Sequence, residues 1–225
     1  MNLSANAENG SKFGEAGTCP LLMDILCKHI TDRDVIYQGC GALSNLETNT
    51  ENEAKLGDAG ICSLLFKILH EYEEDRNVVI FGLSSLWNIS MNAENQTKFE
   101  DADICPLFVE ILRKYIGDGY VIYYGCGALI NLARKGRNRS KFGDLGIYPL
   151  LVKILRGYIG NSDVTYYGFG ALMSLSTYEK YESEFKDIGI FPLLVDISRR
   201  YSSDTTLLNV IRNVQSDFAL ISINN

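Results

Sequence analysis

The stretch that decides the fold is KFGEAGTCPLL at residues 12–22, because close variants of it recur along the whole chain. The later copies are KLGDAGICSLL from residue 55, KFEDADICPLF from 98, KFGDLGIYPLL from 141 and EFKDIGIFPLL from 184. Each copy starts 43 residues after the one before it. A fixed period of this length is typical of repeat proteins, in which each repeat buries its apolar face mainly against its neighbours.

A helix junction is predicted inside this stretch. Gly17 follows a short segment with apolar spacing, as a left-handed helix C-cap requires, and Asp103 takes this place once. Proline follows three residues later in every repeat except the second, which has Ser63, and a proline in the first turn of a helix sacrifices no hydrogen bond. The second helix then carries the apolar residues of one buried face: Leu21, Leu22, Ile25 and Leu26.

A third helix is predicted at about residues 34–47, after a polar loop such as TDRD at 31–34. Its buried face holds Val35, Ile36, Gly39, Cys40, Leu43 and Leu46. We therefore expect a single all-α domain with three helices in each 43-residue repeat, without insertions, at 6–48, 49–91, 92–134, 135–177 and 178–220. Because Asn2 lies 43 residues before Asn45, we interpret residues 1–5 as the remnant of a preceding repeat. Residues 221–225 are a C-terminal tail.

Composition excludes several classes of protein. The 225 residues are 46% hydrophobic, which is enough for a substantial core, and the net charge of −7 disfavours binding to nucleic acid. No apolar run approaches the ~18 residues of a membrane span, and the start lacks the pattern of a secretory signal. Cys19, Cys62 and Cys105 occupy one repeat position, so we expect reduced core cysteines. The expected location is the cytoplasm, with the nucleus left open as a second location.

The order N...F..AG..PLL..IL......V...G.GAL.NL resembles the armadillo repeat, and the resemblance extends through all five repeats. It implies a right-handed α-solenoid whose third helices line a concave face that binds protein. HEAT repeats, which have two helices and usually lack the NL ending, are the nearest alternative.

The same resemblance suggests a ladder of peptide-binding asparagines. In armadillo proteins, asparagines on the third helices bind the backbone of an extended peptide, since one amide both donates and accepts hydrogen bonds. The matching positions are Asn45, Asn88 and Asn131, followed by Ser174 and Asp217. The alternative is a structural ladder in which these side chains only bond neighbouring backbone.

A row of aromatic residues accompanies this ladder on the same helical face. The position seven residues before the asparagine holds Gln38, Phe81, Tyr124 and Tyr167, and Tyr120 lies a further turn back. Tyr123 and Tyr166 are expected to pack inward, at least in part. Four residues before the asparagine, where importin-α-type proteins carry tryptophan, this chain has only small residues: Gly41, Ser84, Gly127 and Gly170. The pattern therefore favours an adaptor that binds neutral or acidic peptides over a nuclear transport receptor.

A basic cluster stands out in this acidic chain. It lies at RKGRNRSK, 134–141, and comprises Arg134, Lys135, Arg137, Arg139 and Lys141. Such a cluster could bind an acidic or phosphorylated partner through charge-assisted hydrogen bonds, or it could be an ordinary solvated bend.

The sequence holds no pattern typical of catalysis. His29 and His70 fall at different repeat positions, and no set of metal ligands or cofactor-binding motif is present. GCGAL lies within a predicted helix, so its glycines indicate close helix packing rather than a phosphate-binding loop. We expect a non-enzymatic scaffold or adaptor that binds an extended peptide segment of a protein. The alternatives are an importin-α-like nuclear transport receptor and a regulator of a folded partner, of the exchange-factor or chaperone type. The oligomeric state stays open.

Overall fold

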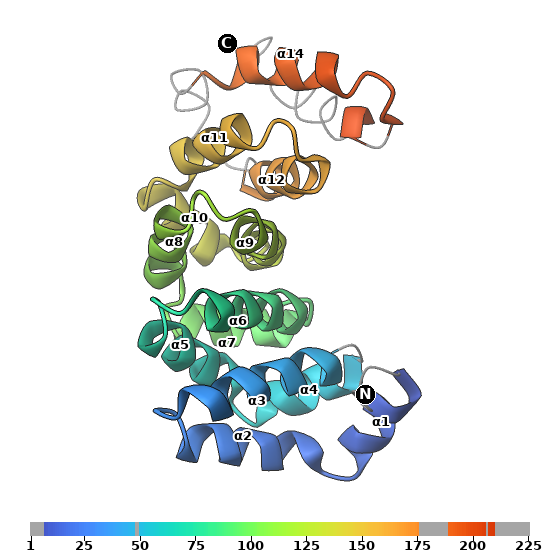
Figure 1. Cartoon of the computed structure of the whole chain (residues 1–225), viewed down its shortest axis with the longest axis vertical. Helices are drawn as coiled ribbons and strands as arrows, with labels where there is room; N and C mark the ends of the chain where they lie inside the picture. Colours follow the sequence, from blue (N-terminus) through green and yellow to red (C-terminus); the bar gives the residue numbers. More distant parts are fainter. Residues whose placement is uncertain (1–6, 48–49, 176–188, 206, 210–225) are drawn as a thin grey trace. The chain divides into compact units, whose positions relative to one another are not determined.

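The computed structural model describes residues 7–47, 50–175, 189–205 and 207–209, and every regular element in these ranges is a helix (Figure 1). The chain divides into two compact units, Met1–Ile111 and Leu112–Asn225, and the division falls inside helix α8. The remnant expected at 1–5, the tail at 221–225 and Asp217 lie outside the described residues.

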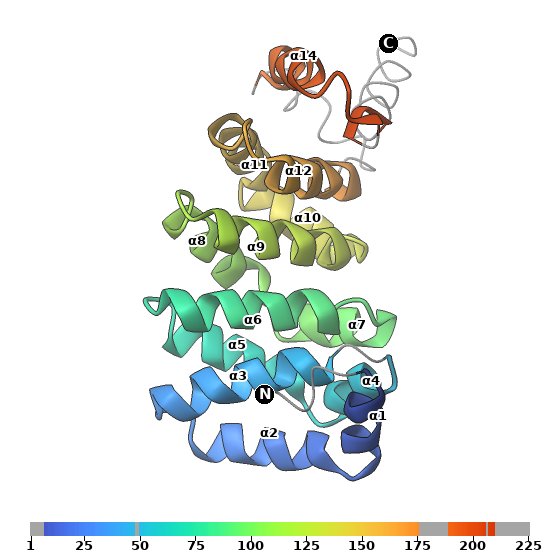
Figure 2. The ribbon, with the colours of Figure 1, turned by 45° about the vertical axis from the view of Figure 1, so that its right-hand side comes forward.

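The N-terminal unit repeats a short helix followed by two longer ones. The first set is α1 (Ala7–Glu15), α2 (Thr18–Lys28) and α3 (Arg33–Leu46), and the second is α4 (Thr50–Asp58), α5 (Ile61–Glu71) and α6 (Arg76–Ile89). Helix α7 (Ala93–Asp101) and the start of α8 (Cys105–Lys114) follow. The third helices α3 and α6 lie side by side (Figure 2). The third helix predicted at 34–47 therefore matches α3 to within one residue.

The C-terminal unit continues the same order. It contains α9 (Gly119–Leu132), α10 (Gly136–Asp144), α11 (Ile147–Gly157), α12 (Ser162–Leu175) and α14 (Ile190–Arg200). Helix α9 packs along α12, so two third helices are neighbours in this unit as well. None of the described helices is long and apolar enough to cross a bilayer.

The predicted helix junctions are confirmed. Gly17, Gly60, Gly146 and Gly189 all have left-handed backbone, and Asp103 has a φ of 54°. Pro20 lies in the first turn of α2, as its missing N–H allows.

Each third helix begins with a side-chain cap that the sequence reading did not assign. The Asp32 carboxylate accepts hydrogen bonds from the N–H groups of Asp34 and Val35. Asp75 and Asp118 occupy the equivalent positions and cap α6 and α9 in the same way. Such caps satisfy N–H groups that have no partner within the helix, and they set where the helix starts.

On each described third helix, the glycine at the position of Gly39 lies in close contact with a leucine of the second helix. A Cβ built on Gly39 would lie 2.2 Å from Leu26 Cδ2, and one on Gly125 would lie 2.4 Å from Leu112 Cδ2. The same contact recurs at the equivalent glycines Gly82 and Gly168, which face Leu69 and Leu155. The close packing predicted for these glycines is therefore confirmed.

A second series of asparagines, on the short first helices, is buried and structural. The Asn52 amide donates to the carbonyls of Gly10 and Leu46, at 2.9 and 3.0 Å. Asn95 donates in the same way to Glu53 and Ile89, at 3.0 and 3.2 Å. Asn138 donates to the Leu132 carbonyl. These amides tie each first helix to the end of the preceding third helix.

The buried face predicted for the second helix is only partly right in the first repeat. Leu26 is buried as predicted, but Leu21 and Ile25 are 59% and 39% exposed, and α2 buries Cys19 and Met23 instead. The equivalent residues of α5, Leu64 and Ile68, are buried. The reason is that α5 packs against the preceding second helix, α2, whereas no described second helix precedes α2 itself.

All six cysteines are free, as predicted. Five are buried, whereas Cys27 is exposed, and it lies outside the repeat positions shared by the others. Burial raises the pKa of Cys40, Cys62 and Cys126 to about 12, so these thiols stay protonated and packed in the core.

Candidate functional site

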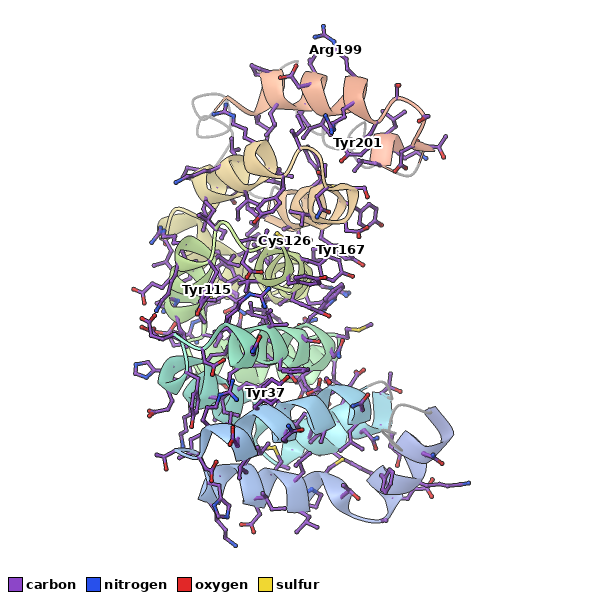
Figure 3. The ribbon with its side chains drawn as sticks, in the orientation of Figure 1. Tyr37, Tyr115, Cys126, Tyr167, Arg199 and Tyr201 are labelled. Atoms are coloured by element: carbon purple, nitrogen blue, oxygen red, sulfur yellow. The ribbon has the colours of Figure 1, made fainter. Side chains whose placement is uncertain are left out.

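Four tyrosines form a continuous cluster on α9 and α12 in the C-terminal unit. The Tyr123 ring packs edge-on against Tyr124 and Tyr167, with ring centroids 5.1 Å apart in both pairs. Tyr167 in turn packs edge-on against Tyr166 at 5.3 Å. Figure 3 marks Tyr167, the member that joins the two helices. We call Tyr123, Tyr124, Tyr166 and Tyr167 the tyrosine cluster.

The tyrosine cluster is open to solvent on one side. Tyr166 is 38% exposed, although we expected it to pack inward in part, and Tyr123, Tyr124 and Tyr167 are half-buried. Tyr120, one turn before Tyr124 on α9, is 67% exposed. Rings held by one another and still accessible lose little rotamer freedom when a partner binds.

Burial is the largest influence on the phenol of Tyr123. It raises the pKa of Tyr123 to about 12, and the neighbouring Tyr167, Tyr124 and Asp163 act in the same direction. The Tyr123 hydroxyl therefore stays neutral at physiological pH and can both donate and accept a hydrogen bond.

The N-terminal unit carries a smaller aromatic pair on α3 and α6. Tyr37, labelled in Figure 3, packs edge-on against Phe81 at 5.3 Å. The Arg33 guanidinium lies 5.1 Å from the centre of the Tyr37 ring and also pairs with Asp75, with Nε 2.8 Å from Oδ2. This hydrogen bond lowers the pKa of Asp75. Of the predicted row, Phe81 is half-buried and Gln38 is exposed on this surface.

Two members of the predicted asparagine ladder bond their own helices. The Asn45 amide donates to the Gly41 carbonyl at 2.7 Å, and the Ser174 hydroxyl donates to the Gly170 carbonyl at 3.0 Å. Both bonds span one turn of the same helix, as in the structural alternative. Asn131 is only 9% exposed.

The amide of Asn88 has its partner on a different helix, unlike the side chains of Asn45 and Ser174. Its amide Nδ2 lies 3.5 Å from Oε2 of Glu47, and its Oδ1 has no partner among the described residues. Because Asn88 is only half-buried, this oxygen can accept a hydrogen bond from outside the protein. Asn88 is therefore the member of the ladder best placed to meet a ligand.

Sequence reasoning missed Glu47, whose carboxylate oxygen lies beside the Asn88 amide. Its side chain is 2% exposed, at the end of α3. Burial raises the pKa of Glu47 to about 8, which the Ser85 and Asn88 side chains oppose and Glu53 reinforces. The available signal was an acid at a repeat position where later repeats carry Ser90 and Ala133.

Part of the basic cluster is engaged in hydrogen bonds within the protein. Arg139 donates from Nε to the Ala133 carbonyl at 2.9 Å, which caps the end of α9. Its repeat counterpart Gln96 makes the equivalent bond to the Ser90 carbonyl. Lys135 and Lys141 are half-buried, so Arg134 and Arg137 are the members that remain exposed.

The two histidines and the residue types that bind metals are the remaining ionisable side chains of interest in the described ranges. His29 and His70 are both exposed. Within the residues that the structure describes, no three His, Cys, Asp or Glu side chains are grouped so that they could hold a metal ion.

Comparison with known proteins identifies the fold. A chain from a solved structure on the phosphorylation switch that controls the interaction between cadherin and beta-catenin superposes with a TM-score of 0.82. This chain has the helical fold of that cadherin–beta-catenin complex chain. The match covers 99% of this chain but 41% of the other, at 21% sequence identity, so this chain spans less than half the length of the protein it resembles. No protein-family model matches the sequence, and no curated protein does.

Proposed function

We propose that this chain is an armadillo-type protein-interaction scaffold that binds an extended segment of a protein partner along its third helices and catalyses no reaction. The observation that carries the proposal is the tyrosine cluster on α9 and α12. Tyrosine is enriched among the residues that dominate binding energy, because its ring supplies apolar area and its hydroxyl supplies a hydrogen bond.

The chemistry of the surface supports a neutral or acidic ligand. Small residues, among them Gly41 and Gly170, stand where transport receptors of the importin-α type place tryptophan, so the stem of a lysine would find no aromatic sandwich. The exposed arginines Arg134 and Arg137, just beyond α9, add positive charge near one end of this helix. An adaptor is therefore favoured over a transport receptor.

An array of immobilised neutral, acidic and basic peptides tests the proposal directly. We expect the wild-type protein to retain neutral or acidic peptides, and we expect Tyr167→Ala to weaken the tightest of them by roughly five- to thirtyfold, as loss of an interface anchor does. His70→Ala, an exposed change on the second helix α5, is the matched control and should leave binding unchanged. Preference for basic peptides would support a transport receptor instead, and equal binding by the Tyr167 and His70 variants would refute the proposed surface.

A further inference from the structure

Glu47 is a buried acid whose two oxygens are unequally satisfied. Oε2 lies 3.5 Å from the Asn88 amide, whereas Oε1 is buried and has no hydrogen-bond partner among the described residues. A buried polar atom without a partner costs stability, so such a group usually serves another purpose.

The rest of the fold does not require an acid at this position. The equivalent position holds Ser90 after α6 and Ala133 after α9, and both residues end their helices normally. The acid at this repeat position is therefore specific to the first repeat. Its hydrogen-bond partner on the neighbouring third helix is Asn88.

We propose that Glu47 is a positioning residue: its buried carboxyl holds the Asn88 amide nitrogen inward, so that Asn88 Oδ1 faces the ligand and accepts a backbone N–H of the bound peptide. This inference rests on the proposed peptide-binding function and specifies how one rung of the ladder works. An amide free to rotate could present either its donor or its acceptor. With its nitrogen held by Glu47, Asn88 presents the acceptor.

The same arrangement makes peptide binding depend on pH. Besides the Glu47 carboxyl itself, the ionisable groups facing it are Glu53 of α4 and the Cys40 thiol of α3, while α6 contributes the uncharged Ser85 and Asn88. When Glu47 ionises, its hydrogen bond from Asn88 becomes charge-assisted and polarises the amide, which makes Oδ1 a better acceptor. Because burial places the pKa of Glu47 at about 8, affinity should rise as the pH increases through this value.

The test uses the full chain and the tightest unmodified peptide recovered from the array. At about pH 7, Glu47→Ala should weaken this peptide by roughly three- to tenfold, and the same change should have no further effect in an Asn88→Ala background. Glu47→Gln retains an acceptor for Asn88, so it should bind nearly as the wild type does at this pH but lose the rise in affinity near pH 8. Glu53→Gln and Ser90→Ala are the controls and should retain that rise.

The outcomes distinguish failure of the ladder from failure of the positioning role. If Asn88→Ala binds the peptide as tightly as the wild type, the ladder has failed at this rung, and the role of Glu47 fails with it. If Asn88→Ala weakens binding but Glu47→Ala does not, or if Glu47→Gln keeps the wild-type pH profile, the positioning role alone is overturned. Independently of any peptide, the side-chain amide resonances of Asn88 should shift with a midpoint near pH 8 in the wild type and not in Glu47→Gln. The absence of such a shift in the wild type would also refute the positioning role.

Discussion

Replacement of Gly125 by alanine tests whether the repeat depends on close contact between its second and third helices. The new Cβ would lie 2.4 Å from Leu112 Cδ2 and 3.6 Å from Leu112 Cγ. Alanine favours the helix by about 1 kcal/mol relative to glycine, whereas overpacking a well-packed core costs about 1–3 kcal/mol. Leu112 is fully buried, so its methyl group can move away only by displacing neighbouring core side chains. We therefore expect a net destabilisation of up to about 2 kcal/mol.

Gly157→Ala is the matched control in the same unit. Gly157 lies in helix α11, and a Cβ built on it would meet nothing within 4 Å. Its helix-propensity gain of up to about 1 kcal/mol should therefore appear without a clash, and the two alanine variants should differ by the cost of overpacking, about 1–3 kcal/mol. Equilibrium urea denaturation of the full chain measures this difference.

A double-mutant cycle separates the Leu112 contact from general effects of the substitution. Leu112→Ala removes the methyl group that would clash, so Gly125→Ala should be tolerated in that background, with a coupling of about 1 kcal/mol or more. Equal stabilisation of the protein by Gly125→Ala and Gly157→Ala would refute the close contact. If the free-energy changes of the two substitutions simply add, any destabilisation by Gly125→Ala arises from contacts other than the one with Leu112.

The remaining predictions concern hydrogen bonds, titration and reactivity. Asn95→Ala should cost about 2–3 kcal/mol in urea denaturation, because it removes two buried hydrogen bonds, whereas Asn45→Ala should cost less than about 1 kcal/mol. Similar costs would contradict their assigned roles. Asp75→Ala should lose the cap of α6 and destabilise the protein by about 1 kcal/mol, and an unchanged denaturation midpoint would show that the cap contributes nothing. Burial raises the pKa of Glu47 from 4.5 to about 8, so between these pH values the folded state binds more protons than the unfolded state. The free energy of unfolding of the wild type should therefore fall as the pH rises from about 4.5 to about 8 and then level off. A Glu47→Gln variant whose free energy of unfolding falls equally over this range would exclude Glu47 as the cause. Cys27 should be alkylated rapidly in the native protein and the five buried thiols slowly, as mass spectrometry of digested protein can check; rapid labelling of several sites would contradict the packed core.

The sequence by itself was sufficient for the helix junctions and for the bounds of the third helix, α3. The left-handed backbone at Gly17 and the proline in the first turn of α2 are local requirements, visible in the residue types themselves. The close contact at Gly39 could also be predicted, because a glycine that recurs at one position of a helix indicates a near neighbour. Such features depend on the chain within a few residues, and the 43-residue period repeats them.

Two series of asparagines show what only the tertiary structure decided. One contains Asn45 and Asn88 and the other contains Asn52 and Asn95, and both recur every 43 residues. Periodicity assigns a residue to a helical face, but it does not give the depth of burial or the partner on the next helix. Those depend on contacts between segments about forty residues apart, such as Asn95 with the Glu53 carbonyl or Asn88 with the Glu47 carboxyl. The packing of neighbouring helices therefore separated the buried amides that bond backbone from Asn88, whose amide lies next to a side chain of the neighbouring third helix.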